Sequence, residues 1–156
     1  MTLAKSPTAR DSAGLPVPLE AAADALCRSA SEAARQHERV AKLNDRGAHH
    51  SEMQEATELR ELAHRHVKAR AQLYELSAAR GKGEQSDAFW HAANTMWHAA
   101  RDYGRRHAEC DAATAKLTKH SSEKLGALAL EYELEASALL GLKNAIAGYR
   151  KVRPDA

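Results

Sequence analysis

The chain has 156 residues, of which 44% are hydrophobic but only 4% aromatic, and it carries a formal net charge of +2 from 23 basic and 21 acidic residues. This length suits one domain with a single core and leaves no room for two domains. The balanced charge argues against nucleic-acid binding, which usually leaves a concentrated basic stripe. Because aromatic residues are rare, alanine and leucine must form most of a thin core.

Residues 1–18 predict a flexible N-terminal arm, because they are rich in small residues and include three prolines. They lack the apolar stretch of a secretory signal, and no run of the chain approaches the ~18 apolar residues of a membrane span. Cys27 and Cys110 fall at different heights of the predicted fold and are expected to be free thiols. We therefore expect a cytoplasmic protein, although some secreted bacterial effectors begin with segments of similar composition.

The rest of the chain predicts four long helices, at residues 19–45, 51–80, 86–119 and 122–150, followed by a frayed tail at 151–156. Pro18 is well placed to open the first helix, and the two glycines of Gly81-Lys82-Gly83 separate the second from the third. Short connections make consecutive helices neighbours. The expected fold is an all-α, antiparallel up-down-up-down four-helix bundle with coiled-coil packing; the alternative is long helical hairpins that pair in a dimer.

The sequence Trp-His-Ala-Ala occurs twice, at residues 90–93 and 97–100. Seven residues make about two helical turns, so the repeated residues share a face. His91 and His98 are both predicted to point toward solvent. They lie too far apart along the helix axis to bind one metal ion. Trp90 and Trp97 lie on the flank of the apolar face, where they widen the surface that the helix can bury. The repeat therefore indicates packing rather than metal chemistry.

A polar residue interrupts the predicted inward stripe of each helix, and the helical rise places these residues at similar depths. The four residues are His37, His66, His107 and Glu135. Three imidazoles and a carboxylate are ordinary ligands for zinc or iron, so a metal site is one hypothesis. A hydrogen-bonded network that fixes the register of the helices is the other. Glu61 and His64 have the Glu-x-x-His spacing of ferritin-like metal sites, but helical periodicity predicts that they lie on the outer face.

The last helix is apolar nearly all round. Its inward stripe contains Leu125, Leu128, Tyr132, Leu139, Leu142, Ile146 and Tyr149. Further apolar or small residues lie on the outer side, and a helix of this kind is normally covered on both sides. We expect an association surface, most simply the interface of a homodimer or a contact with a protein partner. The predicted interface residues are Ala127, Leu130, Leu134 and Gly141, together with Trp90 and Trp97.

The sequence contains neither a glycine-rich phosphate loop nor a nucleophile motif. It therefore favours a non-enzymatic interaction, scaffold or accessory protein that needs no cofactor. A metal-binding bundle centred on the four inward polar residues is the alternative function, and a secreted effector is the third.

Overall fold

The computed structural model describes residues 17–117 and 122–156 and contains four α-helices: α1 (Leu19–Asp45), α2 (His50–Ala78), α3 (Asp87–Ala115) and α4 (Ser122–Val152). This confirms the expected all-α, up-down-up-down four-helix fold, with helix ends close to those predicted. Most of the predicted N-terminal arm, residues 1–16, and the last predicted residues of the third helix, 118–119, lie outside the described residues.

Local signals explain where the helices begin and end. Pro18 precedes α1 with a φ of −61°, the angle to which its ring is confined and one that suits the start of a helix. The side chain of Ser86 caps α3, because its Oγ accepts a hydrogen bond from the backbone N–H of Phe89 at 3.1 Å. Gly81 follows α2 with a φ of 84°, a conformation in which glycine has no steric penalty.

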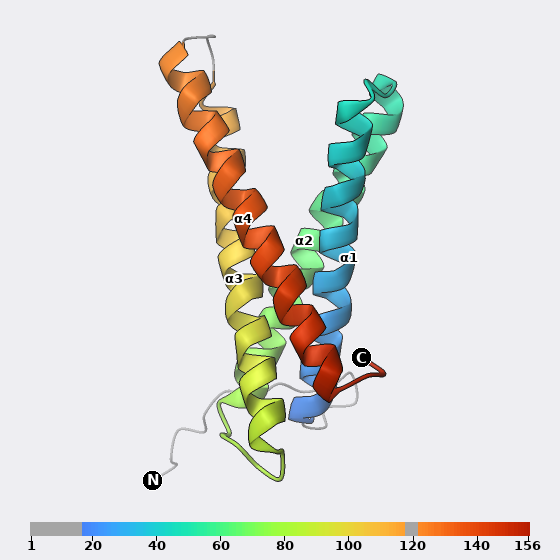
Figure 1. Ribbon diagram of the computed structural model, residues 1–156, viewed down its shortest axis with the longest axis vertical. Helices are drawn as coiled ribbons and strands as arrows, with labels where there is room; N and C mark the ends of the chain where they lie inside the picture. The colour runs from blue at the N-terminus through green and yellow to red at the C-terminus, as the bar shows by residue number, and fades with distance from the viewer. Residues whose placement is uncertain (1–16, 118–121) are drawn as a thin grey trace, which may run out of the picture.

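The helices form two antiparallel hairpins, α1–α2 and α3–α4, which pack together at one end and diverge at the other, so that the molecule has the outline of a V (Figure 1). The closed end of the V holds the starts of α1 and α3 and the ends of α2 and α4. The open end holds the connection between α1 and α2 on one side, and the end of α3 and the start of α4 on the other. The bundle is therefore complete over only part of its length.

The core of the closed end is thin and rich in alanine, as the composition predicts. Its fully buried larger side chains include Leu26, Tyr74, Met96, Leu142 and Tyr149. The buried alanines let the helices approach closely, and α1 contributes the most of them: Ala22, Ala23, Ala30, Ala33 and Ala34.

The predicted inward face of α2 is wrong. The spacing of apolar residues in the sequence predicts an inward stripe of Met53, Leu59, Leu62, His66, Ala69, Leu73 and Leu76. In the structure Leu62 is 43% exposed and His66 is also exposed. The residues that α2 buries instead are Ala56, Ala63, His64, Val67, Ala71, Tyr74 and Ser77. Because helices that pack closely need small side chains between them, alanines rather than leucines mark the buried face of α2.

The inward stripe of α4 is correct in its second half, where Leu139, Leu142, Ile146 and Tyr149 are buried. In the first half, Leu125 is 43% exposed and Tyr132 is 48% exposed, which contradicts their expected burial. Tyr132 lies three residues before the buried Glu135 and so shares its side of the helix. These side chains face the opposite hairpin at a height where the two hairpins have already diverged.

Candidate functional site

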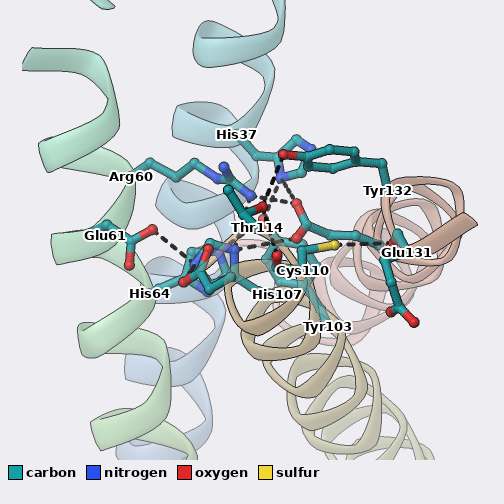
Figure 2. A network of polar contacts seen from close by, with 12 residues as sticks. His37, Arg60, Glu61, His64, Tyr103, His107, Cys110, Thr114, Glu131 and Tyr132 are labelled. Carbon is teal, nitrogen blue, oxygen red and sulfur yellow. Dashed lines mark hydrogen bonds and ion pairs between the residues drawn. The ribbon is translucent and has the colours of Figure 1, made fainter. Parts of the chain in front are cut away.

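Polar side chains from all four helices meet where the two hairpins begin to diverge (Figure 2). The network contains His37 of α1; Arg60, Glu61 and His64 of α2; Tyr103, His107, Cys110 and Asp111 of α3; and Glu135 of α4. Among the described residues, no hydrogen bond or ion pair joins the two hairpins on the open side of this network. In this part of the chain it is the last polar link between them.

Glu135 and Arg60 form the central ion pair. Glu135 is 1% exposed, and its Oε1 accepts a short hydrogen bond from Nη2 of Arg60 and lies 3.2 Å from Nδ1 of His37. Burial alone would raise the pKa of Glu135, but its contact with His107 and the charge of Arg60 lower this pKa to about 2. Glu135 is therefore a buried carboxylate whose counter-ion is supplied by α2.

His107 is the branch point of the network. Its Nδ1 lies 2.9 Å from Arg60 Nη2 and 3.4 Å from Glu135 Oε2. Its Nε2 lies 3.0 Å from Glu61 Oε1 and 3.3 Å from Asp111 Oδ2. Burial lowers the pKa of His107, but the surrounding carboxylates outweigh this effect and hold the pKa above its usual value of 6.5.

Burial disfavours the charged form of the other two histidines of the network. Tyr103 joins them, because its hydroxyl lies 2.8 Å from His37 Nδ1 and 3.1 Å from His64 Nε2. The ring of His64 stacks on that of His107, with centroids 3.6 Å apart. Burial, followed by the charges of His107 and Arg60, lowers the pKa of His64 to about 3. Burial also lowers the pKa of His37, so His107 is the imidazole of this group that is placed to carry charge.

The structure brings together three of the four predicted metal ligands, His37, His107 and Glu135, but not the fourth. His66 is exposed, and His64 takes the inward position on α2, so the expectation that His64 points outward is also wrong. The guanidinium of Arg60 lies between His107 and Glu135, at the centre of the predicted group.

Arg60 and the hydroxyl of Tyr103 were not predicted from the sequence as members of the site. Two signals were available for Arg60. It lies four residues before His64 and therefore shares its face, and a glutamate in the stripe of α4 needs a cation when it is buried.

A groove of about 480 Å³ between α2 and α3 leads to one side of the network. His64, His107 and Asp111 line one part of it, and the basic side chains of Arg65, Lys68, Arg101 and Arg105 line much of the rest. Gly104 lies in its wall, where an added Cβ would meet no atom within 4 Å. The groove gives solvent access to the Nε2 side of His107.

The predicted interface residues of α4 lie away from the core. Ala127, Leu130 and Gly141 are exposed, and Leu134 is half-buried. Trp90 and Trp97 of α3 are also half-buried and pack against the core. Most of the exposed large hydrophobic side chains in the described residues belong to α4: Leu125, Leu130, Tyr132 and Leu140, with Leu62 of α2 as the other.

Comparison of the chain with protein-family models, with curated proteins and with solved structures finds no match. Over the described residues, no helix has both the length and the apolar composition needed to cross a bilayer. The features that bear on function are therefore the polar network, the groove beside it and the exposed apolar surface of α4.

Proposed function

We propose that the protein is a non-enzymatic interaction protein that works by association, and that its partner in this association is a second copy of the chain. The observation that carries the proposal is the exposed apolar surface of α4, formed by Leu125, Leu130, Tyr132 and Leu140, with exposed fractions of 43% to 60%. Single exposed leucines are ordinary on protein surfaces, but apolar side chains grouped along one helix mark an interaction site.

This surface has two sides. At 100° of rotation per residue, Leu125 and Tyr132 lie on the side of α4 that also carries Glu135, facing the opposite hairpin. Leu130 and Leu140 lie on the outer side. A partner that covers both sides must enter the space between the diverging hairpins as well as pack against the outside of α4. A helical hairpin of the same kind has the shape to do this.

Charge favours a second copy as that partner. Beside its exposed leucines, α4 carries the acidic residues Glu131 and Glu133. At the open end of the other hairpin, Arg39 and Lys42 of α1 line a shallow groove and form no ion pair within the described part of the chain. When α4 of one copy lies against α1 of the other, acidic and basic groups meet, and two-fold symmetry makes the same contact twice.

Light scattering of the wild type and of a Leu130→Glu, Leu140→Glu variant tests this proposal. Both leucines are exposed, so the substitutions leave the core intact. We expect twice the 17.0 kDa chain mass for the wild type and a single chain mass for the variant. Leu62→Glu is the matched control, because Leu62 is 43% exposed but lies on α2, and it should leave the dimer unchanged.

Two results would contradict self-association through α4. One is a wild type that has the mass of one chain at micromolar concentration. The other is a double variant that remains dimeric while circular dichroism shows it to be fully helical.

Metal binding at His37, His66, His107 and Glu135, the alternative predicted from the sequence, has less support. Arg60 lies at the centre of this group, and His66 is on the surface.

A further inference from the structure

We propose that Glu61, His107 and Asp111 bind one divalent transition-metal ion on the groove side of the polar network. Each residue offers one ligand atom, and these atoms all lie within 4.8 Å of one another. Figure 2 shows Glu61 of α2 directed at the ring of His107 of α3. The site uses Nε2 of His107, whereas Arg60 and Glu135 face Nδ1, so it is distinct from the four-residue group predicted from the sequence.

The spacing of the ligand atoms fits a small metal ion. Zinc binds imidazole nitrogen and carboxylate oxygen at ~2.0–2.2 Å, which places neighbouring ligand atoms of a tetrahedral site roughly 3.3 Å apart. Nε2 of His107 lies 3.0 Å from Glu61 Oε1 and 3.3 Å from Asp111 Oδ2. His107 and Asp111 are one turn apart on α3, and Glu61 comes from the other hairpin. The ion would therefore connect the two hairpins.

Hydrogen bonding alone leaves one carboxylate in excess at this place. A single N–H on Nε2 of His107 makes one well-directed hydrogen bond, whereas two carboxylates approach that nitrogen. Glu61 and Asp111 also repel each other when no cation lies between them. A metal ion accepts an electron pair from each of the three groups, so neither carboxylate is left without a partner.

A second observation is the buried Oε2 of Glu135, on the other side of the His107 ring. Among the described residues this oxygen has no hydrogen-bond partner; it belongs to a residue that is 1% exposed, and it lies 3.4 Å from Nδ1 of His107. When Nε2 of a histidine binds a metal, the ring proton resides on Nδ1 and is donated to a neighbouring acceptor, commonly a carboxylate. In the structure, Nδ1 accepts a hydrogen bond from Arg60, which can only donate. On metal binding Arg60 would turn fully to Glu135 Oε1, and the proton on Nδ1 would be donated to Glu135 Oε2. This hydrogen bond would orient the ring and strengthen the donation from Nε2.

Among the groups in direct contact with His107, the charge also suits a dication, whereas the basic side chains of the groove lie farther along it. Glu61, Asp111 and Glu135 bring three carboxylates to the ring of His107, and Arg60 supplies one positive charge there. A divalent ion balances the two negative charges that remain. One imidazole with two carboxylates favours a transition ion such as Zn²⁺ over Ca²⁺, which prefers a shell of oxygen atoms. The groove between α2 and α3 leaves room for water in the remaining coordination positions.

Isothermal titration of Zn²⁺ into protein that carries no affinity tag, after treatment with a chelator, tests the site. We expect the wild type to bind one ion per chain. Asp111→Asn should weaken binding at least tenfold, and this variant should fold normally because the Asp111 side chain is 57% exposed. Glu135→Gln should weaken binding about 10- to 100-fold, the usual effect of losing the group that orients a histidine ligand.

His66→Gln is the matched control, because it removes an exposed imidazole from α2 without touching the site. We expect it to bind zinc as the wild type does. The proposal is overturned if the wild type binds no zinc, if Asp111→Asn binds zinc as tightly as the wild type, or if His66→Gln loses binding. Because each variant is compared in its folded state by circular dichroism, the outcome does not depend on whether the chain dimerises.

Discussion

The two ends of the V are held together by different interactions. At the closed end, large apolar side chains such as Leu26, Met96 and Leu142 lie between the hairpins and are fully buried. At the open end, buried side chains such as Leu43 of α1 and Ala56 of α2 lie within one hairpin, and no hydrogen bond or ion pair of the described residues joins the two hairpins there. The difference shows that this chain has enough apolar volume to join its hairpins over only part of their length, which leaves the inner face of α4 available to another chain.

The boundary between the two ends is a buried ion pair rather than an apolar layer. Burying Glu135 and Arg60 costs desolvation energy that their attraction repays only with good geometry and further hydrogen bonds. His37 and His107 supply those contacts, and the hydroxyl of Tyr103 holds His37 in place. We infer that the network fixes the height at which the hairpins meet, a role that apolar side chains alone would leave less specific.

The largest expected effect is at this boundary. Glu135→Leu leaves the charge of Arg60 buried without a partner, and we expect it to lower the free energy of unfolding by about 3–5 kcal/mol. The measurement is chemical denaturation followed by circular dichroism. The double variant Arg60→Leu, Glu135→Leu removes both charges and should recover most of the loss. A double variant as unstable as Glu135→Leu would show that the pair is not energetically coupled.

The next largest effect comes from truncating one buried leucine at each end, which removes the same side-chain volume from both. Leu142→Ala opens a cavity between the hairpins, where Leu142 is fully buried, and should cost about 3 kcal/mol. Leu43→Ala removes a side chain that is 5% exposed within a single hairpin, and it should cost less, about 2 kcal/mol, because a lone hairpin relaxes around the gap more easily. Denaturant midpoints of the two variants check the order. Equal losses would mean that the open end is as tightly packed as the closed end.

The smallest effect is the pH dependence of an ion pair at the closed end. Asp24 of α1 accepts hydrogen bonds from Arg153 at 2.6 Å and from the Tyr149 hydroxyl at 2.5 Å. Burial alone would raise the pKa of Asp24, but these two partners hold it below its usual value of 3.8. The stabilisation is therefore present above pH 3.8 and is lost as the pH falls through the lowered pKa.

Asp24→Asn should cost about 1 kcal/mol at pH 7, where the carboxylate is charged. The difference from the wild type should shrink as the pH falls below about 4. Thermal melts at several pH values measure it. A difference that stayed constant down to pH 2 would contradict the lowered pKa.

The sequence predicted the helices and their order because these depend on local signals such as Pro18, Ser86 and Gly81. It also identified His37, His107 and Glu135 as residues that meet inside the bundle. It failed on α2 because leucine was used as the marker of burial, whereas the close approach of the hairpin selects alanines such as Ala63. Because the predicted inward face of α2 was rotated about the helix axis, His66 was expected inside in place of His64.

The divergence of the hairpins was not predictable from periodicity. The apolar pattern of α4 continues unchanged from its buried half into its exposed half, as Tyr132 and Leu139 illustrate. Whether a patterned residue is covered depends on the presence of a second hairpin at that height, which is a tertiary property. Arg60 was missed for a related reason, since a long charged side chain resembles a surface residue until its partner is known.

The construction from two hairpins also has a consequence for how the chain folds. Within each hairpin, residues that pack together are close in sequence and are joined by a short connection, so the entropy lost on closing the loop is small. Docking of the hairpins must instead bring together residues as distant as Asp24 and Tyr149, which are 125 positions apart. We expect the hairpins to form early and their docking, with burial of Glu135, to be the slow step that commits the chain to its native state.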